Sequence, residues 1–329
     1  MAPLAPILQA FFTDYLVTQR RCSPATIAAY RDGWKLLLTH VHGRTGNAPA
    51  TLEVTDLNAD VISGFLTSLE TGRGNSIATR NARLAAIHCL FAYAALRTPE
   101  HADLIARVLA IPPKQGGQPQ VCFLTATETT ALLAAPDRST WLGRRDHAFL
   151  HVATQTGMRN SELTGLARHD AHLGTGPNLH CTGKRRKERS TPLTRQTVQV
   201  LADWLAERGG QDSDPIFCTR RGGKLSRDAV ERLVAKHTAT AAATCPSLRD
   251  KHVTPHTLRH TAAMALLHSG VDVTVIALWL GHESTNSVMA YVHADMAMKE
   301  QALARVAPHD VPAGRYQPSD TLLNFLTNL

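Results

Sequence analysis

The sequence predicts a mainly helical protein of two domains, the second of which carries a small antiparallel sheet. Apolar residues recur at three- and four-residue spacing along most of the chain, a pattern typical of amphipathic helices. Residues 111–120 interrupt this pattern with three prolines and two glycines, a composition typical of a linker between domains. Two short segments that flank a basic turn in the second domain predict a hairpin of β-strands.

Four helices are predicted in the N-terminal domain. The first lies in the apolar segment that precedes Ser23. Ser23 and Pro24 offer an N-cap and a first-turn proline for the second helix. The third helix is predicted to begin at Thr55 and Asp56, and the fourth at Ser76.

The second domain is predicted to be mostly helical with a small sheet. Gly157 and Gly281 follow apolar helical segments, where they suit the left-handed residue that ends a helix. Short strands are expected over 179–182 and 189–193, on either side of a turn. Helices are expected at about 125–135, 146–155, 194–208, 226–242, 256–268, 272–280 and 285–298.

The composition is that of an ordinary globular protein, with 43% apolar and 19% charged residues. The six cysteines form no C-x-x-C pair, which favours free thiols over disulfides or a cysteine-based zinc site. Neither a signal peptide nor an apolar segment long enough to span a membrane is recognised. We therefore expect a soluble cytoplasmic protein.

The net charge of +8 favours a polyanionic partner such as nucleic acid. Residues 1–115 hold 11 Lys and Arg against 8 Asp and Glu, which leaves 24 against 19 of the chain's 35 and 27 for residues 116–329. Both domains are thus mildly basic. Arg80 and Arg83 lie one turn apart on the fourth predicted helix, and their shared face is either solvated or bound to nucleic acid.

A set of residues suited to phosphodiester chemistry occurs in order along the second domain. Arg159 comes first, then a turn with five basic residues in positions 184–189, then the segment HTLRH at 256–260. A Gly-His pair and Tyr291 follow. Arginines bind the non-bridging oxygens of a phosphate, histidines move protons, and a phenol can be the nucleophile, so this chemistry needs no metal.

Each part of this set also has a simpler interpretation. His256 and His260 lie four residues apart and could bind zinc, but Thr257 stands where metalloprotease sites carry a glutamate. The basic turn could be a solvated hairpin tip, and Tyr291 could be a packing residue. The order and spacing of the whole set favour the phosphoryl-transfer interpretation.

The ordered set resembles the signature of the tyrosine recombinases of the phage-integrase type. The matching segments are TGMRNSEL, GKRRKERSTPL, HTLRH, LGH and the late tyrosine, and the resemblance spans essentially the whole chain. It implies a C-shaped clamp around DNA. Its parts would be a helical SAM-like core-binding domain at 1–110, a linker at 111–122, a mixed α/β catalytic domain at 123–308 and a C-terminal docking tail at 309–329.

The resemblance also implies a role for each matching residue. The two phosphate-binding arginines would be Arg159 and Arg259, and the nucleophile would be Tyr291. Lys184 would be the hairpin lysine that protonates the leaving oxygen, although Lys187 competes for this match. His256 would assist both the nucleophile's proton and the phosphate, and His282 would be a further residue at the phosphate. The remaining assignments are Glu162 and His260 as supporting residues, and Arg80, Arg83, Arg185, Arg186, Lys187 and Arg189 as DNA-binding residues.

The implied activity is site-specific recombination of double-stranded DNA through a 3′-phosphotyrosine, without metal, cofactor or ATP. The implied partners are a pair of inverted core sites, further copies of the chain in a tetramer on two duplexes, and an accessory recombinase as an optional partner. The implied location is the nucleoid. A Xer-like protein and the integrase of a mobile element both remain open. The alternatives are a type IB topoisomerase-like activity and a DNA-binding regulator without catalysis.

The last eleven residues predict a short apolar helix. Leu322, Leu323, Leu326 and Leu329 form one stripe after Ser319 and Asp320, either of which can cap the helix. So short a helix must dock to be stable. It docks either on its own catalytic domain or, as the resemblance implies, on a neighbouring protomer.

Overall fold

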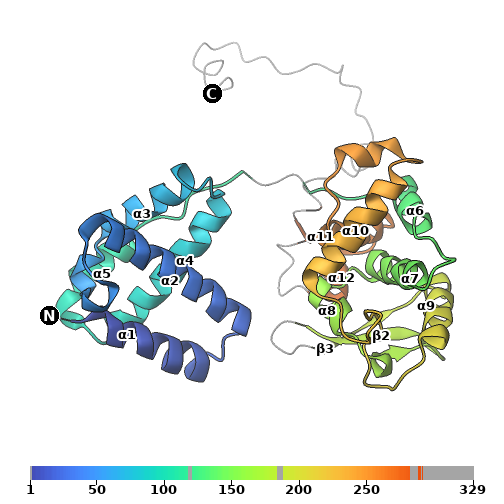
Figure 1. The fold of residues 1–329 in the computed structure, drawn as a ribbon, viewed down its shortest axis with the longest axis horizontal. Coiled ribbons are helices and arrows are strands. Elements are labelled where there is room, and N and C mark those ends of the chain that lie inside the picture. Colours follow the sequence, from blue (N-terminus) through green and yellow to red (C-terminus); the bar gives the residue numbers. More distant parts are fainter. Residues whose placement is uncertain (1, 118–120, 184–187, 282–287, 290, 292–329) are drawn as a thin grey trace, which may run out of the picture. The chain divides into compact units, whose positions relative to one another are not determined.

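The computed structural model describes residues 2–117, 121–183, 188–281, 288–289 and 291 (Figure 1). The chain divides into two compact units, Met1–Pro119 and Gln120–Leu329. The described residues are mostly helical and include one three-stranded antiparallel sheet in the second unit, which confirms the predicted fold class.

The first unit is built from helices alone within its described residues. Its helices are α1 (Leu4–Ala10), which continues into the π-helical turn η1 (Phe11–Gln19), then α2 (Pro24–Thr45), α3 (Ala59–Thr71), α4 (Ile77–Ala95) and α5 (Ala102–Leu109). The predicted N-caps Ser23 and Ser76 are confirmed, because each hydroxyl accepts a backbone hydrogen bond from the third residue after it. Helix α4 packs against α2, α3 and α5 over a core that includes the fully buried Trp34, Phe65 and Phe91.

The predicted start of the third helix at Thr55 and Asp56 is wrong. These residues lie in the 3₁₀ turn η3 (Val54–Asp56), where the Asp56 carboxylate accepts the backbone N–H of Glu53 at 2.8 Å. The N-cap of α3 is Asn58, whose Oδ1 accepts the N–H of Val61 at 3.0 Å. Two capping signals stand close together in the sequence, and the later one begins the helix.

The described part of the predicted linker is fastened to α4. Arg80 Nη1 donates to the carbonyl oxygen of Pro112 at 3.1 Å, and Asn81 exchanges two hydrogen bonds with the backbone of Lys114. Lys114 also forms an ion pair with Glu70 at 2.8 Å. Residues 111–114 are therefore an ordered strap on the first unit.

Within its described residues, the second unit contains the helices α6 to α12 and the sheet. The elements are α6 (Ala126–Ala134), α7 (Trp141–Thr156), α8 (Asn160–Gly165), β1 (Ala171–His172), β2 (Asn178–Thr182), β3 (Glu188–Pro192), α9 (Arg195–Arg208), α10 (Arg227–Ala241), α11 (Pro255–His268) and α12 (Val273–Leu280). The two predicted strands are confirmed as β2 and β3, which pair antiparallel from Asn178 opposite Pro192 to Thr182 opposite Glu188. Of the helix predicted at 285–298, residues 288, 289 and 291 are described and are helical.

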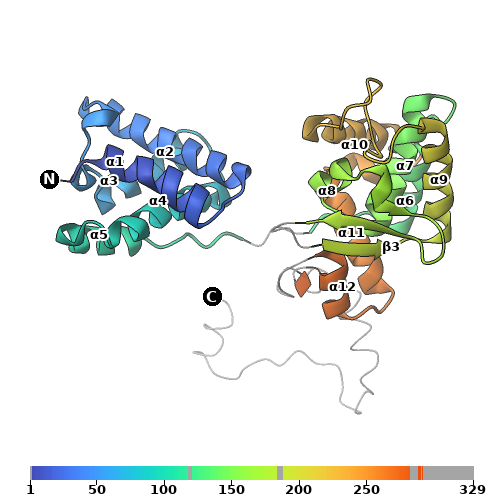
Figure 2. The same cartoon turned by 90° about the horizontal axis from the view of Figure 1, so that it is seen from below.

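Helix α7 is the centre of the second unit (Figures 1 and 2). It packs against α9 and α11 and is buried over most of its length, with Phe149 and Val152 fully inaccessible. It begins at Trp141, earlier than predicted, because Thr140 caps it. A smaller apolar cluster joins α11 and α12 and includes Met264, Leu280 and Tyr291.

No helix among the described residues is long and apolar enough to cross a membrane. All six cysteines are free thiols.

Candidate active site

The N-terminus of α11 presents three of the predicted site residues. Thr254 caps the helix by accepting the N–H of Thr257 at 3.2 Å, and Pro255 occupies the first turn. His256 and His260 follow one turn apart, with ring centroids 4.3 Å apart at an angle of 71°. Among the described residues, no group of three or more His, Cys, Asp or Glu is arranged to hold a metal ion.

Arg259 is 2% exposed and joins the ends of two helices. Its Nη1 donates to the carbonyl oxygen of Gly157 at 2.7 Å, and its Nη2 donates to that of Leu280 at 2.8 Å. Burial, with a contribution from the nearby Arg159, lowers the pKa of Arg259 to about 10. The guanidinium is therefore still a cation at neutral pH, and its two hydrogen bonds go to neutral carbonyls. Glu162 acts on it electrostatically and partly offsets the lowering of its pKa.

Gly157 allows these helix ends to meet. It ends α7 in the left-handed region with φ of +62°, as predicted, and Gly281 ends α12 in the same way with φ of +64°. A Cβ on Gly157 would lie 2.7 Å from Leu280 Cδ2 and 3.0 Å from Ala262 Cβ. Trp279 adds a further tie, because its Nε1 donates to the carbonyl oxygen of Thr156 at 3.1 Å.

Arg159 precedes α8 and is held by that helix's own carboxylate. Glu162 accepts the backbone N–H of Arg159 at 2.7 Å and its Nη1 at 2.9 Å. The Nη2 of Arg159 donates to the carbonyl oxygen of Gly281 at 3.1 Å. One third of the Arg159 side chain remains exposed, so the guanidinium is oriented but still accessible.

Glu162 binds a second arginine, Arg189 of β3. Nη1 and Nη2 of Arg189 donate to the two carboxylate oxygens at 3.1 and 2.8 Å. Burial by itself would raise the pKa of Glu162, but hydrogen bonds from Arg189 and from the Arg159 backbone outweigh burial and lower it below its ordinary value. The carboxylate is thus ionised and shared, so the three side chains together keep one positive charge.

The predicted DNA contacts of Arg80, Arg83 and Arg189 stay predictions, and the structure shows what each of these side chains contacts. Arg80 is 6% exposed, because the strap covers the face of α4 on which it lies. The Arg189 side chain is 12% exposed, and its guanidinium group forms an ion pair with Glu162. Arg83 is half-buried and donates to the carbonyl oxygen of Ala29 at 2.7 Å, so its contact with DNA stays a prediction.

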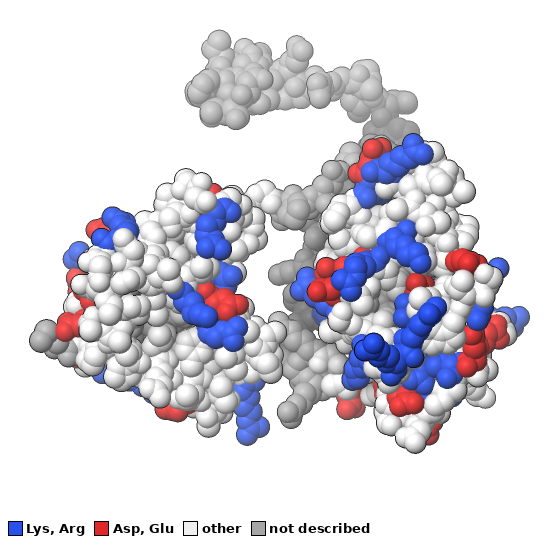
Figure 3. Space-filling model, viewed as in Figure 1, with Lys and Arg blue, Asp and Glu red and all other residues white. Residues whose placement is uncertain are grey.

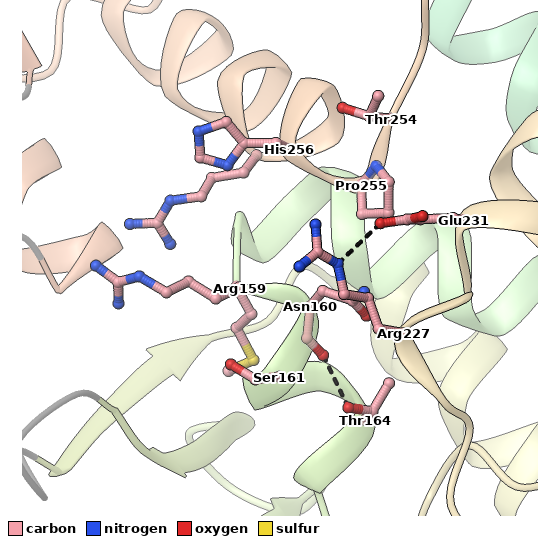
Figure 4. A pocket seen from close by; sticks show the side chains of 11 residues that line it. Arg159, Asn160, Ser161, Thr164, Arg227, Glu231, Thr254, Pro255 and His256 are labelled. Atoms are coloured by element: carbon pink, nitrogen blue, oxygen red, sulfur yellow. Dashed lines mark hydrogen bonds and ion pairs between the residues drawn. The ribbon is translucent and has the colours of Figure 1, made fainter. Parts of the chain in front are cut away.

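A pocket of about 570 Å³ opens where α8, α10 and α11 meet (Figure 4). Arg159 and His256 extend toward one side of it, and an ion pair between Arg227 and Glu231 at 2.9 Å lies on the other side. Arg259 also lines the pocket. Two arginines and one histidine from segments about 100 residues apart in the sequence therefore meet around a space that could hold a phosphate.

Tyr291 is 3% exposed and packs against the far side of His260. Its hydroxyl oxygen lies 2.8 Å from Nδ1 of His260, and the two ring centroids are 5.2 Å apart. Burial raises the pKa of Tyr291, although Arg259 and Arg159 act to lower it. This direct contact between His260 and the tyrosine was not part of the prediction, which placed His260 in a supporting position.

Several predicted site residues lie outside the described residues. These are Lys184, Arg185, Arg186 and Lys187 of the basic turn, His282, and the tail at 309–329.

Basic side chains form several separate clusters on the face of the second unit seen in Figure 3, with acidic side chains between them. On this face the charge of the described residues is therefore distributed and mixed in sign. Among the described residues, Arg159 and Arg259 come together at the pocket.

Comparisons with known proteins identify relatives over nearly the full length. A model of the phage integrase family matches residues 122–298, and a model described as phage integrase, N-terminal SAM-like domain, matches residues 10–98. A Sinorhizobium fredii protein named "Putative integrase/recombinase y4rC" is 50% identical over 328 residues, which cover 100% of this chain and 99% of that protein. The tyrosine recombinase XerC of Pelobacter propionicus is 33% identical over 297 residues, 90% of this chain and 93% of XerC.

Solved structures share the fold at low sequence identity. The XerH site-specific recombinase bound to palindromic difH substrate has a TM-score of 0.70 at 24% identity, covering 87% of this chain and 81% of XerH. The integrase of transposon Tn1549 in complex with circular intermediate DNA has a TM-score of 0.69 at 14% identity, covering 91% of this chain and 99% of that one.

Proposed function

Because the chain belongs to the phage integrase family, whose members are tyrosine recombinases, we propose that it is a site-specific DNA recombinase. It cuts and rejoins DNA through a 3′-phosphotyrosine intermediate and needs neither metal nor ATP. The observation that carries this proposal is the convergence of Arg159 and Arg259 on one pocket, with the hydroxyl of Tyr291 held by the same helix that supplies Arg259.

The two arginines bind the non-bridging oxygens of the scissile phosphate. Neither one depends on DNA for its orientation, because Arg259 is fixed by two carbonyls and Arg159 by Glu162 and Gly281. Preorganised cations of this kind stabilise the charge that grows on the phosphate as the nucleophile attacks. Losing one such contact typically costs about 3–4 kcal/mol of barrier, or about 10²–10³ in rate.

Tyr291 is the nucleophile. Its attack on phosphorus gives a 3′-phosphotyrosine and a free 5′-hydroxyl, so the energy of the phosphodiester is retained and the strand can be rejoined without ATP. His256 donates to the phosphate from the wall of the pocket. Lys184 as the acid for the leaving oxygen and His282 as a further phosphate contact complete the proposed set.

The proposed partner is double-stranded DNA that carries a pair of inverted core sites. Both halves of the chain are mildly basic, which suits a duplex bound by both units. We further propose a tetramer on two duplexes, with the tail at 309–329 docking on a neighbouring protomer, an accessory recombinase as an optional partner, and a nucleoid location.

Two other activities could use this chemistry or this fold. A type IB topoisomerase-like enzyme would relax one duplex without exchanging partners. A regulator would bind DNA without cutting it, but binding alone requires neither a tyrosine held beside a histidine nor two fixed arginines.

A suicide substrate tests the proposal. On a nicked duplex that traps the cleaved strand, we expect the wild-type protein to form a covalent adduct and Tyr291→Phe to form none while binding DNA with unchanged affinity. Arg159→Ala and Arg259→Ala should slow cleavage far more than they weaken binding. Adducts formed by Tyr291→Phe, or equal losses of binding and cleavage in the arginine variants, would contradict these roles.

A further inference from the structure

His260 lies between the phosphate pocket and the tyrosine. It follows His256 by one turn of α11, with 4.3 Å between the two ring centroids, and its other side faces Tyr291. Its Nδ1 is 2.8 Å from the tyrosine hydroxyl oxygen. Among the described residues, His260 is the hydrogen-bond partner of the Tyr291 hydroxyl.

We propose that His260 is a catalytic residue, whose Nδ1 accepts the proton of the Tyr291 hydroxyl as that oxygen attacks the phosphate. The proposal rests on the function proposed above and concerns the nucleophile's proton within it. His256 is exposed and lines the phosphate pocket, so it serves the phosphate and not the phenol.

The burial of Tyr291 makes a protein group necessary for this step. The residue is 3% exposed, and its neighbours in the apolar cluster include Met264 and Leu280. Water therefore has little access to the hydroxyl, and an unpaired phenolate in such surroundings would carry a large desolvation cost. Nδ1 of His260 is already within hydrogen-bonding distance, and in the tautomer with its proton on Nε2 it can accept the phenol proton.

The electrostatic surroundings keep His260 in the form that can accept a proton. Burial, together with the neighbouring His256 and Arg259, lowers the pKa of His260 to about 4, so the imidazole is neutral near pH 7. A phosphate that enters the pocket brings negative charge close to α11, which favours the imidazolium and makes His260 a stronger base. The base therefore gains strength when the substrate is in place.

The step balances as follows in atoms and charge. The Tyr291 oxygen forms a bond to phosphorus, the bond from phosphorus to the 5′-oxygen breaks, and the phenol proton moves to Nδ1 of His260. The neutral imidazole, which carries its proton on Nε2, becomes an imidazolium. The 5′-oxygen takes a proton from the acid of the site. In rejoining, His260 returns its proton to the tyrosine oxygen as that oxygen leaves.

The test combines His260→Asn with a more acidic phenol. The amide of asparagine can occupy the position of Nδ1 and hold the hydroxyl, but it cannot take a proton at neutral pH. In single-turnover adduct formation on the suicide duplex, we expect His260→Asn to be slower by about 10²–10⁴-fold, the usual contribution of a general base. Replacing Tyr291 by a fluorinated tyrosine, whose phenol ionises more readily, should recover at least tenfold in the His260→Asn background.

Controls separate proton transfer from packing. The same fluorinated tyrosine should give little recovery in Arg159→Ala, because that variant still has the base and has instead lost a phosphate contact. His172→Asn, an exposed position on β1, should cleave like wild type. The proposal is overturned if His260→Asn cleaves within threefold of wild type, if the fluorinated tyrosine changes both backgrounds equally, or if the recovery occurs in His256→Asn instead. A wild-type protein that forms no adduct at all would instead overturn the proposed function, and the proposal with it.

Discussion

Glu162 is predicted to set both the stability and the activity of the second unit, because it holds two arginines at once. Its side chain is 3% exposed, and it accepts two hydrogen bonds from Arg189 and two from Arg159. Glu162→Gln keeps the shape but leaves two neighbouring guanidiniums without a counter-charge. Removing one partner of a buried ion pair typically costs about 3–5 kcal/mol. We expect the lower end, about 3 kcal/mol, because Arg159 is one-third exposed and can be solvated.

Arg189→Met should cost less than Glu162→Gln. The carboxylate would keep Arg159 and its backbone N–H, so the expected loss is that of charged hydrogen bonds, about 1.5–3 kcal/mol. In the double variant no buried charge is left unpaired at position 189. We therefore expect the loss of unfolding free energy in the double variant to be about 1–3 kcal/mol smaller than the sum of the two single losses.

Urea unfolding of the full chain, followed by tryptophan fluorescence, measures these losses. Three of the four tryptophans, Trp141, Trp204 and Trp279, lie in the second unit, so the signal reports mainly on that unit. The rate of adduct formation in these variants should not change in proportion to their stability. The double variant should stay at least tenfold below wild type, because Arg159 has lost the group that orients it. Strictly additive stability losses, or a double variant with restored cleavage, would refute this reasoning.

Three further predictions follow from local geometry. Gly157→Ala should destabilise the protein by about 2–4 kcal/mol, of which about 1–2 kcal/mol is left-handed backbone strain and the remainder is overpacking against Leu280. Gly222 has φ of +83° and open space where a Cβ would lie, so Gly222→Ala should show the strain alone. Equal losses for the two variants in thermal unfolding would contradict the packing argument. Hydrogen bonds from Lys251, the Thr125 backbone and Ser247 outweigh the effect of burial and lower the pKa of Glu128 to about 2. The stability that Glu128 contributes is therefore complete above about pH 4.5 and is lost as the pH falls toward 2. Glu128→Gln should lose stability less steeply than wild type over that window, and parallel curves of stability against pH would argue against this pairing. Deletion of residues 318–329 should impair assembly of the proposed tetramer on DNA, as read by native gel or light scattering, and unchanged assembly would remove the proposed role of the tail.

Much of the fold could be predicted because its signals are local. Helix starts at Ser23 and Ser76 were visible as a capping side chain before an apolar helical pattern, and Gly157 and Gly281 were visible as helix ends. The short elements α5, α8 and β1 escaped prediction. A two-residue strand such as β1 is defined by its pairing with β2 and has no periodicity of its own.

The site was predicted as a list of residues, but not as a set of contacts. The spacing of Arg80 and Arg83 placed them on one helical face, yet it could not tell that the strap covers this face at Arg80. Arg189 pairs with a carboxylate 27 residues earlier, and His260 meets a tyrosine 31 residues later. Such pairs depend on how β3 and the helix after α12 pack in three dimensions, and no local pattern encodes that.

The central claim is that Tyr291 itself becomes bonded to the 3′ end of the cut strand without a metal ion. The most direct test is to trap the adduct on a suicide duplex in EDTA, digest protein and DNA, and sequence the peptide that carries a nucleotide by mass spectrometry. The account predicts undiminished adduct in EDTA and a 3′-linked nucleotide on Tyr291. A nucleotide on another residue, or cleavage that requires a divalent ion, would contradict it.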